Sequence, residues 1–267
     1  MSESSRARVM VTNDDGIASA GLSALARVSI AAGLDVLVAA PEGEASGTSA
    51  ALTATADGGR ILIRRTELAG LPGVPAYAMS ATPAFITFTA VRGAFGPPPR
   101  LLLSGINLGP NTGRAVLHSG TVGAAMTAAV SGVRAAAFSL DVRDPGAEPH
   151  WDTAAQVAGQ VLPALPGLAP GVLLNVNIPN VSLAQFRGIR SAPMARHDAV
   201  QVAVVATTEE FLEVKMSESG EDPEPDSDAA LLAAGFASVT PVRPVSEGPL
   251  TVLPWPPATP AEARHLG

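Results

Sequence analysis

The chain of 267 residues contains no cysteine, few aromatic residues and no apolar run long enough to cross a bilayer. The absence of cysteine excludes disulfide bonds and thiolate metal sites, and it favours the cytoplasmic location that we expect. Aromatic residues make up only 4% of the chain, so its core must pack through small aliphatic side chains. Residues 1–8 are polar and show no secretory signal, so we expect no association with a membrane.

Positive charge is also scarce, and the formal net charge is −7. This balance argues against a protein that binds duplex nucleic acid, because such proteins usually carry a basic patch. A small phosphorylated substrate remains compatible, since a metal ion and a helix N-terminus can neutralise its charge locally. With 47% hydrophobic and 15% charged residues, the chain can build a sizeable core in one large domain, or in a domain with an appendage.

Strands and helices are predicted to alternate along the first two thirds of the chain. Residues 8–12 read as a buried strand, 22–32 have helical spacing that ends at Gly33, and 35–40 read as a second strand. This βαβ unit implies parallel strands. Further strands are predicted at 60–65, 75–79, 101–104, 135–140 and 171–177, and helices at 82–95, 121–131 and 152–162. The pattern predicts a doubly wound α/β fold with a mostly parallel sheet, whose ligands bind at the carboxyl ends of the strands.

The pattern changes after Pro179. Residues 200–207 and 211–216 alternate like a β-hairpin, and 236–240 return as a strand. We therefore expect an α/β core at 1–185, a β-rich extension at 186–252 and a Pro-rich tail at 253–267. A free two-stranded hairpin is only marginally stable in water, so the extension should pack either on a second subunit or on the rest of its own subunit.

Two adjacent carboxylates, Asp14 and Asp15, follow the first predicted strand. Adjacent carboxylates supply the hard oxygen ligands that divalent cations such as Mg²⁺ prefer. Asp-Asp-Gly is also an ordinary turn sequence. The metal interpretation is favoured because two other polar loops also leave predicted strand ends. One contains Ser46, and the other contains Asn107 and Asn111.

Glycines mixed with Asn, Ser and Thr characterise residues 104–113 and 119–123, just before a predicted helix. Such loops supply backbone N–H groups for an anion, so a metal and a phosphate in one cleft suggest phosphoryl chemistry. Asp14 or Asp15 would orient or deprotonate the attacking water, and we favour Asp14 for the deprotonation. His118 could protonate the leaving alkoxide, or it could simply pack or cap beside the loop. No Gly-x-Gly-x-x-Gly follows the first strand, which disfavours a dinucleotide oxidoreductase.

The order and spacing of these motifs resemble the SurE (survival protein E) family of metal-dependent 5′/3′-nucleotidases and phosphatases. The resemblance covers roughly residues 8–252, including Asn175-Val176-Asn177 and the segment from Asp228 to Pro241. It implies one divalent metal ion per subunit, Mg²⁺ or Mn²⁺ with Ca²⁺ also possible, and a homodimer or homotetramer that exchanges its C-terminal hairpins. The metal ligands that it implies are Asp14, Asp15, Ser46 and Asn107, and the phosphate-binding residues are Asn111, Ser119, Gly120 and Thr121, to which we add Asn13 and Gly47.

The chain departs from the family pattern without losing any of these metal ligands. Phe85 and Thr127 stand where acidic residues are usual, and Ala45 stands where a basic residue is common. We predict a phosphomonoesterase of the 5′-nucleotidase or acid phosphatase type, with Asp14, Asp15 and His118 as catalytic residues. Its substrates would be nucleoside 5′(3′)-monophosphates or related small phosphate esters. The alternative is a non-catalytic protein that binds a phosphate ligand and retains the metal cradle, and the departures at Phe85 and Thr127 leave it open.

Overall fold

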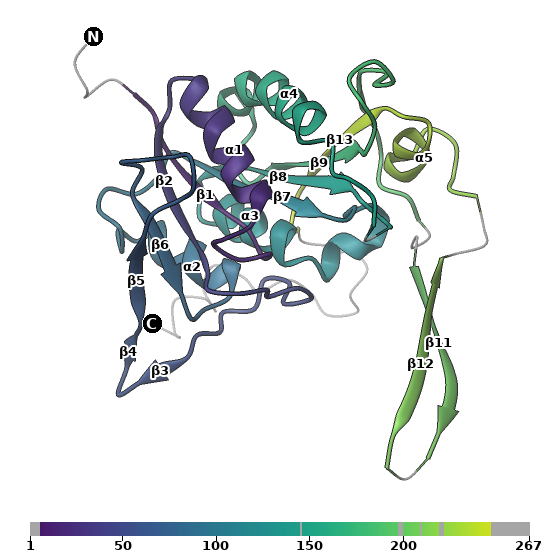
Figure 1. Cartoon of the computed structure of the whole chain (residues 1–267), viewed down its shortest axis with the longest axis horizontal. Helices are drawn as coiled ribbons and strands as arrows, with labels where there is room; N and C mark the ends of the chain where they lie inside the picture. The colour runs from purple at the N-terminus through teal and green to yellow at the C-terminus, as the bar shows by residue number, and fades with distance from the viewer. Residues whose placement is uncertain (1–5, 145, 197–199, 209, 219–221, 247–267) are drawn as a thin grey trace, which may run out of the picture.

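A nine-stranded sheet forms the centre of the computed structural model, which describes residues 6–144, 146–196, 200–208, 210–218 and 222–246 (Figure 1). The strands lie in the order β10-β13-β9-β8-β7-β1-β2-β6-β5. Their bounds are β1 Arg8–Thr12, β2 Asp35–Pro41, β5 Ile63–Thr66, β6 Ala76–Met79, β7 Leu101–Leu108, β8 Arg134–Asp141, β9 Leu173–Pro179, β10 Ile189–Ser191 and β13 Ala237–Val242. The strands from β6 to β9 are parallel, whereas β5 and β13 run antiparallel to their neighbours β6 and β9.

Helices cover both faces of the sheet, as a doubly wound fold requires. α1 (Ala20–Ala31) and α4 (Trp151–Val161) pack on one face, and α2 (Pro83–Ala90) and α3 (Gly120–Val130) pack on the other. Successive residues of β1 enter opposite cores, since Val9 and Val11 face α1 while Met10 faces α3. The predicted α/β fold is therefore confirmed.

Several predicted boundaries were wrong by a few residues. α1 begins at Ala20 because Ser19 caps it by accepting the N–H of Leu22. α2 begins after its predicted cap, Thr82, but ends at Ala90 rather than 95 because the chain turns at Gly93, where φ is +90°. The predicted strand 60–65 is two strands, β4 (Arg60–Ile61), which pairs with β3 (Ala56–Asp57), and β5.

The largest difference in the core concerns β7, which was predicted to end at residue 104 and extends to Leu108. Its pairing with β8 is interrupted between Ser104 and Asn107 and then resumes, with Asn107 opposite Ser139. The segment that was predicted as the start of a loop is therefore a distorted continuation of the strand. A 3₁₀ helix, η2 (Gly113–Leu117), follows it, and a second, η3 (Leu162–Gly167), follows α4.

The predicted hairpin is present as β11 (Val200–Thr207) and β12 (Leu212–Glu218), which extend away from the sheet (Figure 1). The strand predicted at 236–240 does not belong to this extension. It lies in β13, which pairs with β9 and β10 in the main sheet, because the chain returns through α5 (Asp228–Ala233) to the sheet edge. The range 186–252 therefore supplies two strands of the core sheet. The predicted tail, 253–267, lies outside the described residues. No helix in the described part is long and apolar enough to cross a membrane.

Candidate metal and phosphate site

Three polar loops meet at the carboxyl edge of the sheet because β1 lies between β2 and β7. Asp14 and Asp15 follow β1, Ser46 follows β2, and Asn107 lies at the end of β7. The strand order reverses direction around β1, and doubly wound sheets bind ligands at such switch points. The fold thus brings the predicted metal ligands to one edge.

Asp14 is buried and is held by the start of α3. Its Oδ1 accepts a hydrogen bond from the hydroxyl of Thr121, the second residue of that helix, and its main-chain carbonyl accepts the N–H of Ala45 at 2.7 Å. The positive end of the helix dipole favours a carboxylate at this position. Thr121 was predicted only as a phosphate contact, so its bond to Asp14 is an interaction that sequence reasoning missed.

Two glycines let α3 lie directly against the aspartate and the loop after β2. A Cβ on Gly120 would lie 2.8 Å from Asp14 Oδ2 and 3.0 Å from the hydroxyl oxygen of Thr48. A Cβ on Gly123 would lie 2.0 Å from the carbonyl oxygen of Ser49. Any side chain at these positions would push the helix N-terminus away from the site.

The surroundings of Asp15 change its pKa. Burial, together with the charges of Asp14 and Glu44, raises the pKa of Asp15 to about 7, and a hydrogen bond from the backbone of Leu108 at the end of β7 opposes the rise. Burial also raises the pKa of Asp14, against the hydrogen bond from Thr121. Glu44 is therefore a third carboxylate near the pair. Sequence reasoning missed it, although it stands only two residues before Ser46, whose hydroxyl donates to Glu44 Oε1 at 2.9 Å.

The oxygen atoms at this edge fit a hard divalent cation. Seven buried side-chain oxygens in the described residues have no hydrogen-bond partner. Four of them belong to β1, to the loop after it or to β7, namely Asp15 Oδ2, Asn13 Oδ1, Thr12 Oγ1 and Ser104 Oγ. Thr12 and Ser104 are paired across β1 and β7, and Thr12 and Asn13 directly precede the two aspartates. A cation would satisfy buried oxygen atoms and offset the repulsion between the carboxylates.

Asn107 and Ser46, the two neutral ligands predicted for this cation, differ in their surroundings. The amide nitrogen of Asn107 donates to the carbonyl of Gly109 at 2.8 Å, which leaves its carbonyl oxygen for a cation. Ser46 and Gly47 are exposed. No group of three or more His, Cys, Asp or Glu residues in the described part has a metal-binding arrangement. A metal at this edge would therefore need oxygens from other residue types, and Ser46 and Asn107 remain the predicted neutral ligands.

Asn111 is buried and anchored to the sheet. Its main-chain N–H donates to Asn177 Oδ1 at 2.7 Å, and its carbonyl oxygen accepts the side-chain amides of Asn175 and Asn177. Its own side-chain amide donates to the hydroxyl of Ser139 at 2.7 Å, which leaves one of its two amide hydrogens for a phosphate.

Ser119 and His118 precede α3 and differ in their surroundings. Ser119 is buried and caps α3 by accepting the N–H of Val122 at 3.0 Å, so its hydroxyl hydrogen stays available. His118 is exposed at the end of η2, and its ring makes no hydrogen bond to either aspartate within the described residues. The hydroxyl of Ser49 donates to the carbonyl of Leu117 at 2.6 Å and ties the loop after β2 to this turn.

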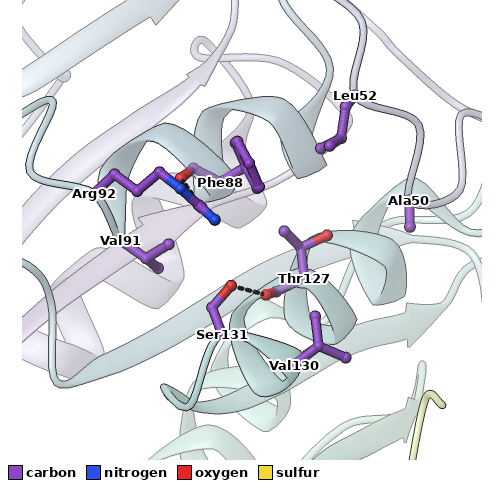
Figure 2. A pocket seen from close by; sticks show the side chains of 8 residues that line it. All are labelled: Ala50, Leu52, Phe88, Val91, Arg92, Thr127, Val130 and Ser131. Atoms are coloured by element: carbon purple, nitrogen blue, oxygen red, sulfur yellow. Dashed lines mark hydrogen bonds between the residues drawn. The ribbon is translucent and has the colours of Figure 1, made fainter. Parts of the chain in front are cut away.

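Two of the positions that depart from the family pattern, Phe85 and Thr127, lie in α2 and α3. Phe85 is half-buried, and its N–H donates to the cap Thr82. Thr127 donates to the carbonyl of Gly123 at 2.8 Å and lines an open cavity of about 560 Å³ between the two helices. Figure 2 shows Thr127 facing this space, with Phe88 and Arg92 on the opposite wall. At Thr127 the hydroxyl is therefore satisfied within its own helix.

Comparison with known proteins identifies the family. The family model described as survival protein SurE matches residues 9–201, which is more than half of the chain. The chain belongs to the SurE family. It is 34% identical over 241 residues to the 5′/3′-nucleotidase SurE of Yersinia pestis, covering 88% of this chain and 89% of that protein. It is 36% identical over 251 residues to the 5′-nucleotidase SurE of Deinococcus radiodurans, covering 91% and 89%.

The fold of the family is confirmed by a solved structure. The crystal structure of the SurE protein from Aquifex aeolicus is similar to this chain with a TM-score of 0.75 and 28% identity. The similarity covers 89% of this chain and 94% of the Aquifex chain. The SurE resemblance and the doubly wound α/β architecture predicted from the sequence are therefore both confirmed.

Proposed function

We propose that this chain is a metal-dependent phosphomonoesterase that hydrolyses nucleoside 5′(3′)-monophosphates or related small phosphate esters. The observation that carries the proposal is the contact between Asp14 and the first turn of α3, which puts a cation-binding carboxylate beside an anion-binding helix N-terminus. The names of the relatives from Yersinia pestis and Deinococcus radiodurans support the same reaction.

Different residues of the chain would bind the metal and the phosphate. A divalent cation, Mg²⁺ or Mn²⁺, held by Asp14, Asp15, Ser46 and Asn107 would supply Lewis acidity at the phosphoryl group. The first N–H group of α3, at Gly120, has no acceptor within the helix, so it would bind a phosphate oxygen and stabilise the charge of the transition state. The backbone of Thr121 hydrogen-bonds Asp14, so Thr121 would join the phosphate site beside that aspartate. Asn111, Ser119 and Gly47 complete the proposed phosphate site. Asn13, which was predicted to join them, donates its amide to the carbonyl of Gly16 and the hydroxyl of Ser19, so we assign its free oxygen to the metal half.

Proton transfer is assigned to three side chains. Asp14, oriented by the hydroxyl of Thr121, would take the proton of the attacking water, and Asp15 would orient that water. His118 would protonate the leaving alkoxide, or would act only as a packing residue beside the loop. Comparing the rate for an ester with a good leaving group in the His118→Ala variant separates the two, because an acid is dispensable when the leaving group is already stable.

A phosphate-release screen tests the proposed reaction. The purified chain would be offered nucleotides, sugar phosphates and polyphosphate, each with and without added Mn²⁺ or Mg²⁺. We expect metal-dependent release from nucleoside monophosphates. Tight binding of a nucleotide without release from any ester would instead indicate a non-catalytic phosphate-ligand binding protein.

The hairpin supports a proposed homodimer or homotetramer. β11 and β12 pair only with each other within the described residues, and Val205 and Phe211 on the hairpin are both 57% exposed. An isolated two-stranded hairpin is marginal in water, so we expect it to dock on a neighbouring subunit. Replacing residues 200–218 with a short linker should reduce the mass measured by light scattering. A monomeric intact chain would show that the hairpin packs on its own subunit. The proposed location is the cytoplasm, on the absence of cysteine.

A further inference from the structure

Asp228 is a fully buried carboxylate to which the proposed reaction assigns no role. It is the first residue of α5 and is 0% exposed. Burial raises the pKa of Asp228, and hydrogen bonds from the backbone oppose that rise. A buried carboxylate is costly unless hydrogen bonds satisfy it, so its contacts show what it holds in place.

The carboxylate of Asp228 connects three separate parts of the chain. Its Oδ2 accepts the N–H of Gly113 at 2.9 Å, across 115 positions of sequence. Its Oδ1 accepts the N–H of Ala195, in the segment that leads to the hairpin, and that of Ala229 in its own helix, both at 2.8 Å. The side chain therefore joins α5 and the segment before the hairpin to the start of η2.

Gly113 lies at a critical point of the proposed phosphate site. It follows Asn111 by two residues and begins η2, which leads directly to His118 and Ser119. On the opposite side, Asn175 and Asn177 of β9 hold the main chain of Asn111. The loop is therefore held by hydrogen bonds to the side-chain amides of Asn175 and Asn177 in the sheet and to the carboxylate of Asp228 in α5.

We propose that Asp228 is a positioning residue for the phosphate site, because it sets the segment from Asn111 to Ser119 against the sheet edge. The inference rests on the proposed function for its catalytic meaning. An amide cannot replace the carboxylate here. Asparagine has one acceptor oxygen and would turn an NH₂ group toward either Gly113 or the pair Ala195 and Ala229. Asp228→Asn should therefore break either the hydrogen bond from Gly113 or those from Ala195 and Ala229.

The test compares Asp228→Asn with Ser227→Ala in the full-length chain loaded with Mn²⁺. Ser227 caps α5 by accepting the N–H of Ala230 at 3.2 Å, so its loss weakens the same helix while leaving the Gly113 contact intact. We expect Asp228→Asn to weaken the binding of inorganic phosphate about tenfold, to raise KM for a nucleoside monophosphate similarly, and to accelerate hydrogen exchange at Gly113. Mn²⁺ affinity should stay unchanged. Ser227→Ala should lower the melting temperature but leave hydrogen exchange at Gly113 and the affinity for inorganic phosphate unchanged.

The wild-type chain supplies a measurement that does not depend on the variant folding. The amides of Gly113, Ala195 and Ala229 share one acceptor group, so their hydrogen exchange should be protected and should respond together to denaturant. Rapid exchange at Gly113 in the wild type overturns the inference, and so does a Ser227→Ala variant that loses phosphate affinity as Asp228→Asn does. A chain that binds phosphate through this loop but hydrolyses no ester would sink the proposed function and leave the role of Asp228 standing. Absence of phosphate binding in the wild type would overturn both.

Discussion

The two halves of the proposed site differ in how completely their polar groups are satisfied. On the metal half, Asp15 Oδ2 and Asn13 Oδ1 are buried without partners, and burial and neighbouring charges raise the pKa of Asp15 to about 7. On the phosphate half, the main chain of Asn111 and the N–H of Gly113 are hydrogen-bonded to Asn177 and Asp228. In the proposed site, hydrogen bonds within the protein already hold the phosphate half, whereas a cation would complete the metal half.

Removal of the metal should have the largest effect on activity, and it acts on the metal half of the site. We expect chelation by excess EDTA to abolish phosphate release, because the metal half has no protein group that can replace the charge of a cation. The fold should persist, since β1 and α3 remain joined through Asp14 and Thr121. Full activity in EDTA, after metal analysis confirms that the protein is stripped, would contradict the assignment.

Asp15→Asn should reduce Mn²⁺ affinity at least tenfold, because a neutral amide is a weaker ligand for a hard cation than a carboxylate. Isothermal titration calorimetry with Mn²⁺ provides the measurement. The matched control is Asp35→Asn, which removes an exposed aspartate at the start of β2, away from the site. If the Asp15 variant binds Mn²⁺ like the wild type, Asp15 is not a ligand.

On the phosphate half, Asn111→Ala and Ser119→Ala should weaken inhibition by inorganic phosphate several-fold and leave Mn²⁺ affinity nearly unchanged. Ser119→Ala should also cost about 1 kcal/mol of stability, the typical value of a helix N-cap. Ser139→Ala is the matched control for Asn111, because it removes the partner of the same amide but keeps the amide itself. An equal loss of phosphate affinity in Ser139→Ala would mean that Asn111 acts through its anchor. Loss of Mn²⁺ binding with unchanged phosphate inhibition would contradict the assignment of both residues.

The last expected effect is a pH dependence of stability in the metal-free chain. Because the folded state raises the pKa of Asp15 from 3.8 to about 7, the folded chain binds more protons than the unfolded chain between these values. Stability should therefore fall as pH rises from about 4 to about 7. Melting temperatures across this range provide the measurement, and Asp15→Asn should flatten the dependence. An unchanged fall in the variant would show that another group carries the dependence.

The sequence predicted the parts of the site that depend on local pattern. Asp14 and Asp15 follow an apolar run, so their position at a strand end could be inferred from periodicity, and the Gly, Ser and Thr residues at 119–123 indicated a helix N-terminus that could bind an anion. The contact between Gly113 and Asp228 could not be inferred, because it joins residues 115 positions apart through the return of the chain to the sheet. The membership of β13 in the main sheet was missed for the same reason, since its partner β9 lies before the hairpin.

The position of β13 between β9 and β10 has a consequence for protein synthesis. The ribosome makes both Asp14 and Asp15 early, but the strand that covers the edge of β9 is made only after the whole hairpin and α5 have emerged. A nascent chain that stops before residue 237 carries both aspartates and leaves β9 as an open edge, the kind of surface on which chains aggregate. Closure of this edge of the sheet therefore depends on β13, which is made long after the segment that holds both aspartates.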